Sequence, residues 1–216
     1  MDVRAGGVKP SRLEEEIAPS RAQNRSSAVA SMDTNRPMLV TFIGGGAGSW
    51  SVQGMTTIKG EGLPYVERID VVEGSDRPGY WTWALRGTIE PDHYVLDAER
   101  HALAARQAPL GRPTATSAAM IPIRKRAEWW ALPHHERRAI FEERSHHVAS
   151  SLAYLPRIAR RLHHGRELGE PFDFITWFEF APTDGAAFDD LVGVLHATEE
   201  WIYVEREVDI RLRRST

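Results

Sequence analysis

The C-terminal part of the chain constrains the fold most, because it alternates between strand and helix patterns. Asp173–Phe180 (DFITWFEF) is mostly apolar and rich in aromatic residues, which predicts a strand covered on both faces. Gly185–His196 has the period of an amphipathic helix, and Trp201–Leu212 alternates like a strand with one buried face. The apolar positions are Phe188, Leu191, Val192 and Leu195 in the helix and Ile202, Val204, Val208, Ile210 and Leu212 in the last strand.

Shorter apolar runs predict further strands earlier in the chain. They are Met38–Ile43, Val66–Val72, Tyr80–Thr88 and Ala119–Arg124. Pro91–Gln107 has a helical pattern, and the proline and glycine that follow it predict that the helix ends there. The glycines of residues 44–48 fit no phosphate-binding fingerprint and precede no helix pattern. We therefore interpret them as the turn at the end of a strand.

A long helical pattern runs from His134 to Leu162, with Pro133 at its start. Proline inside a helix removes a backbone hydrogen bond and clashes with the preceding turn. We therefore expect the helix to break or kink at Pro156.

The order of these elements predicts an α+β fold, with antiparallel sheets and helices packed on one side. The C-terminal half, about residues 116–216, has the strand and helix order of a ferredoxin-like unit. The N-terminal half, about residues 37–115, is interpreted as a shorter copy of that unit. Residues 1–36 are polar and rich in Ser, Arg and Ala, which predicts a disordered extension; Met32 is an alternative start.

The composition excludes several classes of protein. The net charge of −3 argues against a general nucleic-acid binder, because such proteins are usually basic. The chain has no cysteine, which excludes disulfides, iron–sulfur clusters and thiolate-bound haem or zinc. Any metal must therefore be held by His, carboxylate or Tyr side chains. No secretory signal and no apolar run of the ~20 residues that span a membrane is found, and we expect a soluble, cytoplasmic protein.

Six of the nine histidines stand in adjacent pairs, at 134/135, 146/147 and 163/164. Neighbours on a helix point about 100° apart, so one member of a pair at most can face a given pocket. A surface or capping role is the default for each histidine. His147 differs, because Ile140 and Phe141 precede it and Tyr154 and Leu155 follow it at about two turns. It can therefore lie on or beside a buried stripe.

Four arginines cluster after Pro156, at positions 157, 160, 161 and 166. Two interpretations stay open for them, a solvated helix face and a phosphate-binding surface. The acidic net charge favours the first for most of them. A buried arginine would differ, because it needs a carboxylate or another anion to compensate its charge.

Two long stretches of the chain carry a resemblance to a known family. They are IPIRKRAEWWALPHHERRAIFEERSHHVASSLAYLPRIARRLHH and FDFITWFEFAPTDGAAFDDLVGVLHATEEWIYVEREVDIRLRR. Both are similar to the chlorite dismutase family. The resemblance runs from about Met38 to Arg214, and the modest length with the phrase GEPFDFITWFEF is similar to the short members. It implies a ferredoxin-like dimeric α+β barrel with helices packed outside and one haem b in each subunit.

The resemblance also implies the two residues that flank the haem iron. His147, in SHHVASSLAYL, is in the position of the proximal ligand that binds the metal, and Glu200 matches the carboxylate that accepts its other ring hydrogen. Arg160, in RIARRL, is in the position of the distal arginine. An unbroken helix from His147 to Arg160 would turn by about 220° and rise by ~20 Å, so the break at Pro156 is needed for both to reach one iron.

Four further residues take expected roles from the same resemblance. Lys125 matches a lysine that reaches a haem propionate. Trp129 and Trp130 match tryptophans beside the haem. Gln107 matches the residue against which the distal arginine rests in short members.

The implied activity is conversion of chlorite to chloride and dioxygen through a ferryl and hypochlorite intermediate. The implied protein is a homodimer that binds haem and a small anion, but no nucleic acid and no membrane. Arg160 would attract chlorite and hold hypochlorite beside an apolar wall that includes Ile121 and Ile123. Two alternatives stay open on the same fold: decarboxylation of coproporphyrin haem, against which Arg160 argues, and a non-enzymatic haem-binding or stress-response role.

Overall fold

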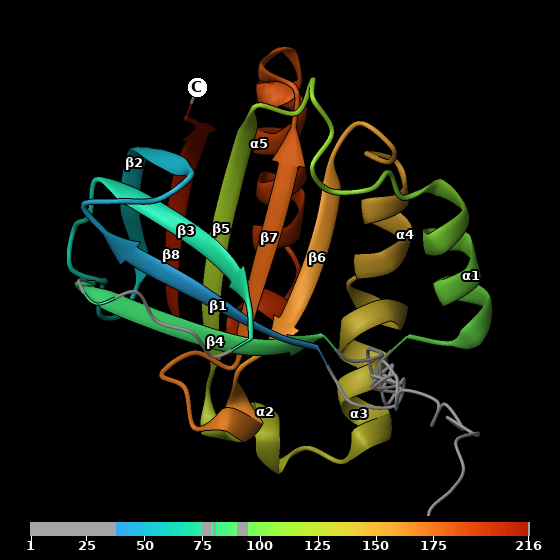
Figure 1. Ribbon diagram of the computed structural model, residues 1–216. Coiled ribbons are helices and arrows are strands. Elements are labelled where there is room, and N and C mark those ends of the chain that lie inside the picture. Colours follow the sequence, from blue (N-terminus) through green and yellow to red (C-terminus); the bar gives the residue numbers. More distant parts are fainter. Residues whose placement is uncertain (1–37, 75–78, 80, 90–94, 216) are drawn as a thin grey trace, which may run out of the picture. The chain divides into compact units, whose positions relative to one another are not determined.

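The computed structural model describes residues 38–74, 79, 81–89 and 95–215, which form a closed antiparallel barrel with helices on its outside (Figure 1). The strands are β1 (Met38–Gly45), β2 (Trp50–Lys59), β3 (Arg68–Glu73), β4 (Trp83–Ile89), β5 (Ser117–Lys125), β6 (Ala159–His164), β7 (Phe174–Phe180) and β8 (Val204–Arg214). The helices are α1 (Asp97–Arg106), α2 (Ala127–Ala131), α3 (His134–Arg138), α4 (His147–Leu152) and α5 (Gly185–His196), with a π-helical segment η1 (Ala139–Arg144) and short 3-10 turns η2 (Arg166–Leu168), η3 (Pro182–Asp184) and η4 (Glu199–Tyr203). The extension expected for residues 1–36, including Met32, lies outside the described residues.

The barrel consists of two arcs, one from each half of the chain. The order around it is β1-β3-β2-β8-β5-β7-β6-β4, so each arc places the fourth, first, third and second strand of its half side by side. The arcs are joined unequally. β2 and β8 pair along most of their length, whereas the pairing described between β4 and β6 is limited to Thr88 and His164. We call the junction between these two strands the β4–β6 seam.

Apolar side chains from alternate strand positions fill the barrel interior. Five of them with no exposed surface are Phe42, Ile69, Met120, Ile175 and Ile210. A glycine is required where the Trp83 indole crosses β1, because a Cβ on Gly44 would lie 2.4 Å from the ring. The glycine-rich end of β1 therefore serves packing as well as the predicted turn.

The predicted strand at 173–180 and helix at 185–196 are confirmed as β7 and α5. Helix α5 lies on the outer faces of β5 and β7, where Phe188 stacks on Phe180 with ring centroids 4.7 Å apart. Its buried residues are Phe188, Leu191, Val192 and Leu195. Each such side chain contributes roughly 1.5–3 kcal/mol when it leaves water. No helix in the described part of the chain is both long and apolar enough to cross a membrane.

The helical region predicted from His134 to Leu162 is interrupted twice: at His146, which was not predicted, and around Pro156, where the predicted break is confirmed. His146 has a left-handed backbone conformation, with φ of 51°, which makes His147 the first residue of α4. After Leu152 the chain turns around Pro156, and the residues from 159 to 164 form strand β6 instead of helix. Strand β6 pairs with β7 along its whole length, so pairing in the folded sheet overrides the local pattern of ARRLHH.

Strand β2 was not predicted from the sequence. Its inward residues lie opposite the buried apolar residues of β8, but the register shifts between Val52 and Gly54 and again between Thr57 and Lys59. Each shift moves the apolar positions out of the period of two that identifies a strand. The last strand also starts later than predicted, at Val204, and Ile202 is 64% exposed in η4.

A histidine is buried inside the barrel. His163 is 2% exposed, meets the edge of Phe42 with centroids 4.9 Å apart, and has its Nδ1 atom 3.1 Å from the Ile175 carbonyl oxygen. Gly87 lies directly against it, since a Cβ there would be 2.5 Å from the His163 Cβ. Desolvation lowers the pKa of His163 to about 4, against the hydrogen bond to Ile175, and Arg161 adds to the lowering.

We expect the free energy of unfolding to fall as the pH drops from 6.5 towards 4. In this window the unfolded chain binds a proton at His163 that the folded chain still excludes, so stability rises with pH. The loss between pH 7 and pH 5 is about 2 kcal/mol, since one pKa unit is worth 1.36 kcal/mol. Urea unfolding at both pH values measures it, and His163→Gln should flatten the dependence. Equal pH slopes for the wild type and the variant would contradict the assignment.

Candidate functional site

A cavity of about 400 Å³ lies between the outer face of the sheet and the helices α1, α4 and α5. Its volume is within the range of small-molecule sites. Apolar side chains of β5, β6, β7 and α5 form much of its wall, among them Ile121, Ile123, Leu162, Phe174, Phe178 and Leu195. The expected apolar wall with Ile121 and Ile123 is therefore present beside a small number of charged groups.

Three ionisable side chains that line the cavity are linked to one another: buried Glu200 and Lys125, and partly buried His147. His147 Nδ1 lies 2.7 Å from Glu200 Oε2, and Lys125 Nζ lies 2.8 Å from Glu200 Oε1. Glu200 and Lys125 are 5% and 3% exposed. The carboxylate thus has one partner on each oxygen, and we call the three residues the His147–Glu200–Lys125 triad.

The triad fixes which ring nitrogen of His147 is available. Desolvation opposes the charge of Glu200, but the Lys125 ammonium and His147 outweigh it and lower the pKa of Glu200 to about 2. An ionised carboxylate can only accept hydrogen bonds, so in the neutral imidazole the hydrogen stands on Nδ1. The lone pair then lies on Nε2, on the side of the ring away from Glu200.

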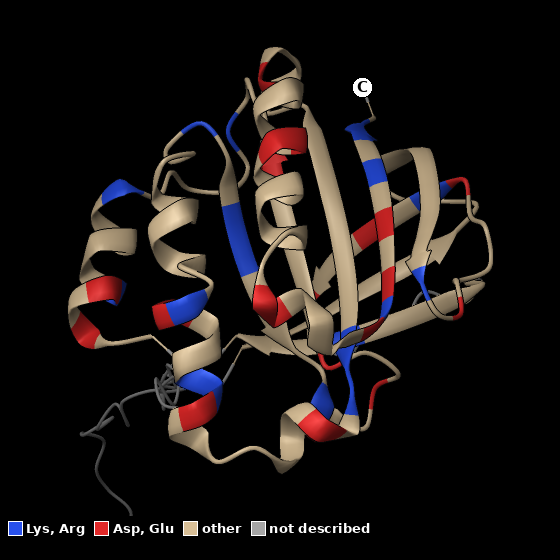
Figure 2. Cartoon of the chain, turned by 180° about the vertical axis from the view of Figure 1, so that it is seen from behind, with Lys and Arg blue, Asp and Glu red and all other residues tan. Residues whose placement is uncertain are grey.

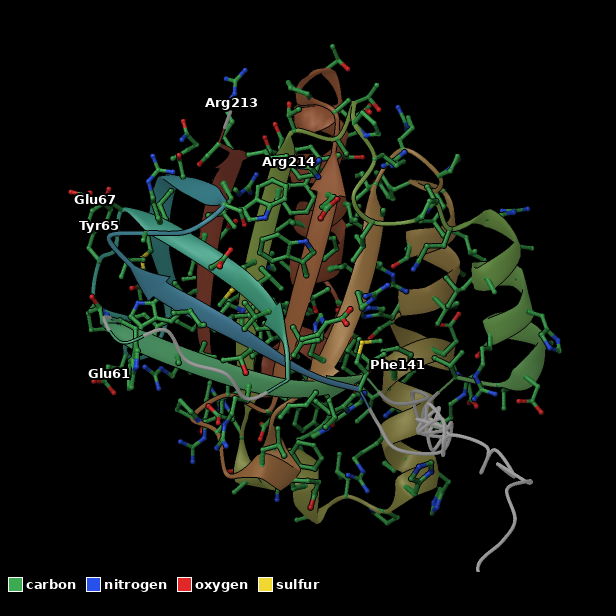
Figure 3. All side chains as sticks on the ribbon, viewed as in Figure 1. Glu61, Tyr65, Glu67, Phe141, Arg213 and Arg214 are labelled. Atoms are coloured by element: carbon green, nitrogen blue, oxygen red, sulfur yellow. The ribbon has the colours of Figure 1, made fainter. Side chains whose placement is uncertain are left out.

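The local backbone places His147 at this point. The left-handed turn at His146 starts α4 anew, and the Glu142 carboxylate accepts the backbone N–H groups of Val148 and Ala149 at 2.6 and 3.2 Å. Phe141, a residue of η1, stacks on the imidazole with ring centroids 4.5 Å apart; it is labelled in Figure 3. The imidazole is therefore held on one edge by hydrogen bonding and on one face by an aromatic ring.

The two predicted tryptophans take different places. Trp129 lines the cavity and is 1% exposed, with Lys125 Nζ 4.6 Å from its ring centroid. Trp130 lies behind the wall, stacked on Phe174 at 5.9 Å, with its indole N–H donating to Asp173 at 3.3 Å. Lys125 was expected at a haem propionate, but its charge is already matched by Glu200.

Arg160 reaches the cavity from β6, as the turn at Pro156 allows. The side chain of Gln107, just after α1, also lines the cavity and donates from Nε2 to the Arg160 backbone oxygen at 2.7 Å. Of the seven site residues expected from the sequence, the cavity wall thus includes Gln107, Lys125, Trp129, His147, Arg160 and Glu200.

Sequence reasoning missed a second His–carboxylate pair at the cavity. His196 Nε2 lies 2.7 Å from Oε1 of Glu207, a fully buried residue that also accepts the Trp201 indole N–H at 2.9 Å. Only the position of Glu207 on the outward face of β8 hints at this pair, since α5 covers that face. Across the described residues, no group of three or more His, Asp or Glu side chains is arranged to hold a bare metal ion.

Comparisons with known proteins agree on one family. The sequence model of the family described as chlorite dismutase matches residues 78–215. A chlorite dismutase from Ideonella dechloratans is 37% identical over 73 residues, which is 34% of this chain but only 24% of that longer protein. The match thus spans about a quarter of the curated relative.

Solved structures extend the likeness to the fold. A dimeric chlorite dismutase from Nitrobacter winogradskyi is 53% identical, with a TM-score of 0.77 over 82% of this chain and 99% of that chain. A mutant chlorite dismutase from Candidatus Nitrospira defluvii is 18% identical, with a TM-score of 0.56 over 82% of this chain and 91% of that chain, and shows the fold alone. With its family model matched over more than half of its length, this chain belongs to the chlorite dismutase family.

Proposed function

We propose that the protein is a haem b-dependent chlorite dismutase, which converts chlorite to chloride and dioxygen. The observation that carries this proposal is that His147, held through Nδ1 by Glu200, lines the same cavity as Arg160. Membership of the family supports the reaction, and the geometry supports the two roles that the reaction needs.

The residues present fit a haem. The wall is largely apolar and aromatic, as a porphyrin ring requires, and His147 offers one imidazole nitrogen. One protein ligand is enough for a haem iron, because the porphyrin supplies the others. His147 would therefore hold the iron, and Trp129 and the Ile121–Ile123 segment would contact the ring.

The triad sets the character of the proposed ligand. Glu200 keeps the hydrogen of His147 on Nδ1, which fixes the ring orientation and makes Nε2 a stronger donor. Lys125 keeps Glu200 ionised and in place. When bound, haem supplies the redox-active iron at which the oxygen–chlorine bonds of chlorite are broken. Both oxygen atoms of the dioxygen come from chlorite, so no external electron donor is needed.

Arg160 would bind the substrate anion in the cavity that His147 also lines. Its guanidinium is permanently charged and presents paired N–H donors that match an oxyanion. The neighbouring Ile121 and Phe178 carry no acid or base that could compete for protons. Arg160 therefore attracts chlorite and retains the hypochlorite formed from it. Its presence favours this activity over decarboxylation of coproporphyrin haem.

We also infer a homodimer built from two ferredoxin-like halves in each subunit. The support for a dimer is the Nitrobacter relative, which is described as dimeric. The support for two related halves, about residues 37–115 and 116–216, is the shared strand order of the two arcs.

The haem-loaded protein should release one dioxygen for each chlorite consumed, measured with an oxygen electrode. His147→Ala should release dioxygen at least about a hundredfold more slowly at equal haem. Changes to the groups around a metal ligand already cost roughly 10–100-fold in activity, and this variant removes the ligand itself. Arg213→Gln, an exposed change on β8, serves as the control. Intact holoprotein that releases no oxygen would contradict the proposed reaction and leave a haem-binding role.

Lys125→Met should lower the free energy of unfolding of the haem-free protein by about 3 kcal/mol at pH 7, because it leaves Glu200 buried without its cation. The double variant Lys125→Met/Glu200→Gln should recover part of the loss. Lys59→Met is the matched control, since Lys59 donates to a backbone oxygen instead of a carboxylate. Urea titration measures all three, and a loss below about 1 kcal/mol for Lys125→Met would show that the ion pair is not essential to the fold.

A further inference from the structure

We propose that Arg161 is a second anion-binding group, at the mouth of the cavity, which captures the substrate anion before it reaches Arg160. The inference rests on the proposed function and extends it to a residue beyond those expected from the family. The ligand chemistry is a small monovalent oxyanion.

Strand geometry separates Arg161 from Arg160. Neighbouring side chains on a strand point to opposite faces. Arg160 stands opposite Phe178, on the outer face that forms the cavity wall, whereas Arg161 stands opposite Trp177, on the face that packs inside the barrel. Two adjacent residues of one strand would not normally line a single cavity.

Both nevertheless line the cavity, close to the β4–β6 seam. Among the described residues, β4 and β6 pair at Thr88 and His164, and no described strand pairs with this edge of β6 at Arg161. Ile89, at the end of β4, lines the same cavity as the two arginines. Arg161, like Arg160, is partly exposed and can be reached from solvent.

The charge of Arg161 is not matched by the protein. Within the described ranges, no carboxylate lies within ion-pair distance of its guanidinium and no hydrogen bond holds it. Other cations of the wall are matched: Arg100 pairs with Asp97 at 2.5 Å, and Lys125 with Glu200. The basic stretch of β6 lies between α4 and α5 (Figure 2).

The net positive charge of the side chains that line the cavity favours binding of an anion. Its lysine and arginine side chains are Arg100, Lys125, Arg160 and Arg161, while Glu200 is its carboxylate among the described residues. Because Glu200 already faces Lys125 and His147, it does not neutralise Arg161, and the wall carries more positive than negative charge. A cavity with walls of one charge concentrates ions of the other charge and raises their association rate.

Nitrite binding to the ferric haem-loaded protein tests the capture step, because nitrite is a small oxyanion and imidazole is a neutral ligand of the same iron. In stopped-flow measurements at low ionic strength, Arg161→Gln should slow nitrite association about three- to tenfold. Imidazole association should change less than about twofold. The nitrite difference should shrink at 0.5 M salt, where the Debye length is a few ångströms.

Arg213→Gln is the matched control. Arg213 is an exposed arginine at the far end of β8, pointing away from the barrel (Figure 3), and its loss should leave both rates unchanged. Equal slowing of nitrite and imidazole by Arg161→Gln would indicate a structural effect and overturn the proposal. Unchanged nitrite rates would overturn it too.

Arg161 could also bind a carboxylate of the haem, which is an anion like the substrate. A separate experiment distinguishes the two. Haem and haem dimethyl ester are titrated into the haem-free protein and followed by quenching of tryptophan fluorescence. If Arg161→Gln weakens haem alone while nitrite rates stay unchanged, the arginine serves the cofactor and substrate capture is wrong. Normal imidazole binding without oxygen release from chlorite would contradict the proposed function and not the anion site.

Discussion

The hydrogen-bonded contact between His147 and Glu200 is the interaction on which the site depends. A carboxylate buried to 5% exposure is costly unless its charge is compensated, and Lys125 provides this compensation at 2.8 Å. The ionised Glu200 then accepts from Nδ1 of His147 and directs the lone pair of Nε2 away from itself. The cationic lysine therefore acts on the proposed iron ligand through one intervening carboxylate.

The fold supplies the frame for this contact from separate parts of the chain. Lys125 ends β5, His147 begins α4 and Glu200 lies in η4 just before β8. Within the arc of the C-terminal half, β5 pairs antiparallel with β8 as far as Lys125 and Val204, which brings Lys125 close to η4. On the other side of this half, the described pairing between β4 and β6 is limited to Thr88 and His164, and Arg161 of β6 lines the cavity there.

The sequence predicts best where a single period dominates. The helical spacing of Phe188 and Leu191 identified α5 with its observed ends, and the apolar run of β7 was equally clear. Prediction from the sequence failed at β2, where bulges interrupt the alternation of apolar residues. It also failed at β6, whose arginines and histidines show no strand pattern and which is held as a strand by pairing with β7.

For the site, too, some features were predicted from the sequence and others were not. The roles of His147 and Arg160 came from the family resemblance, because a histidine or arginine within a polar helical pattern is by itself unremarkable. The pairing of Lys125 with Glu200 depends on contact between segments that lie 75 residues apart in the sequence. Local sequence patterns do not identify contacts of this kind.

The central claim is that Nε2 of His147 binds the iron while Glu200 accepts from Nδ1. Resonance Raman spectroscopy of the ferrous haem-loaded protein tests it most directly, because the iron–imidazole stretching frequency reports both the bond and the basicity of the ring. The account predicts a stretching band in the wild type, its absence in His147→Ala, and a lower frequency in Glu200→Gln. A band that persists in His147→Ala, or that is unmoved in Glu200→Gln, would contradict it.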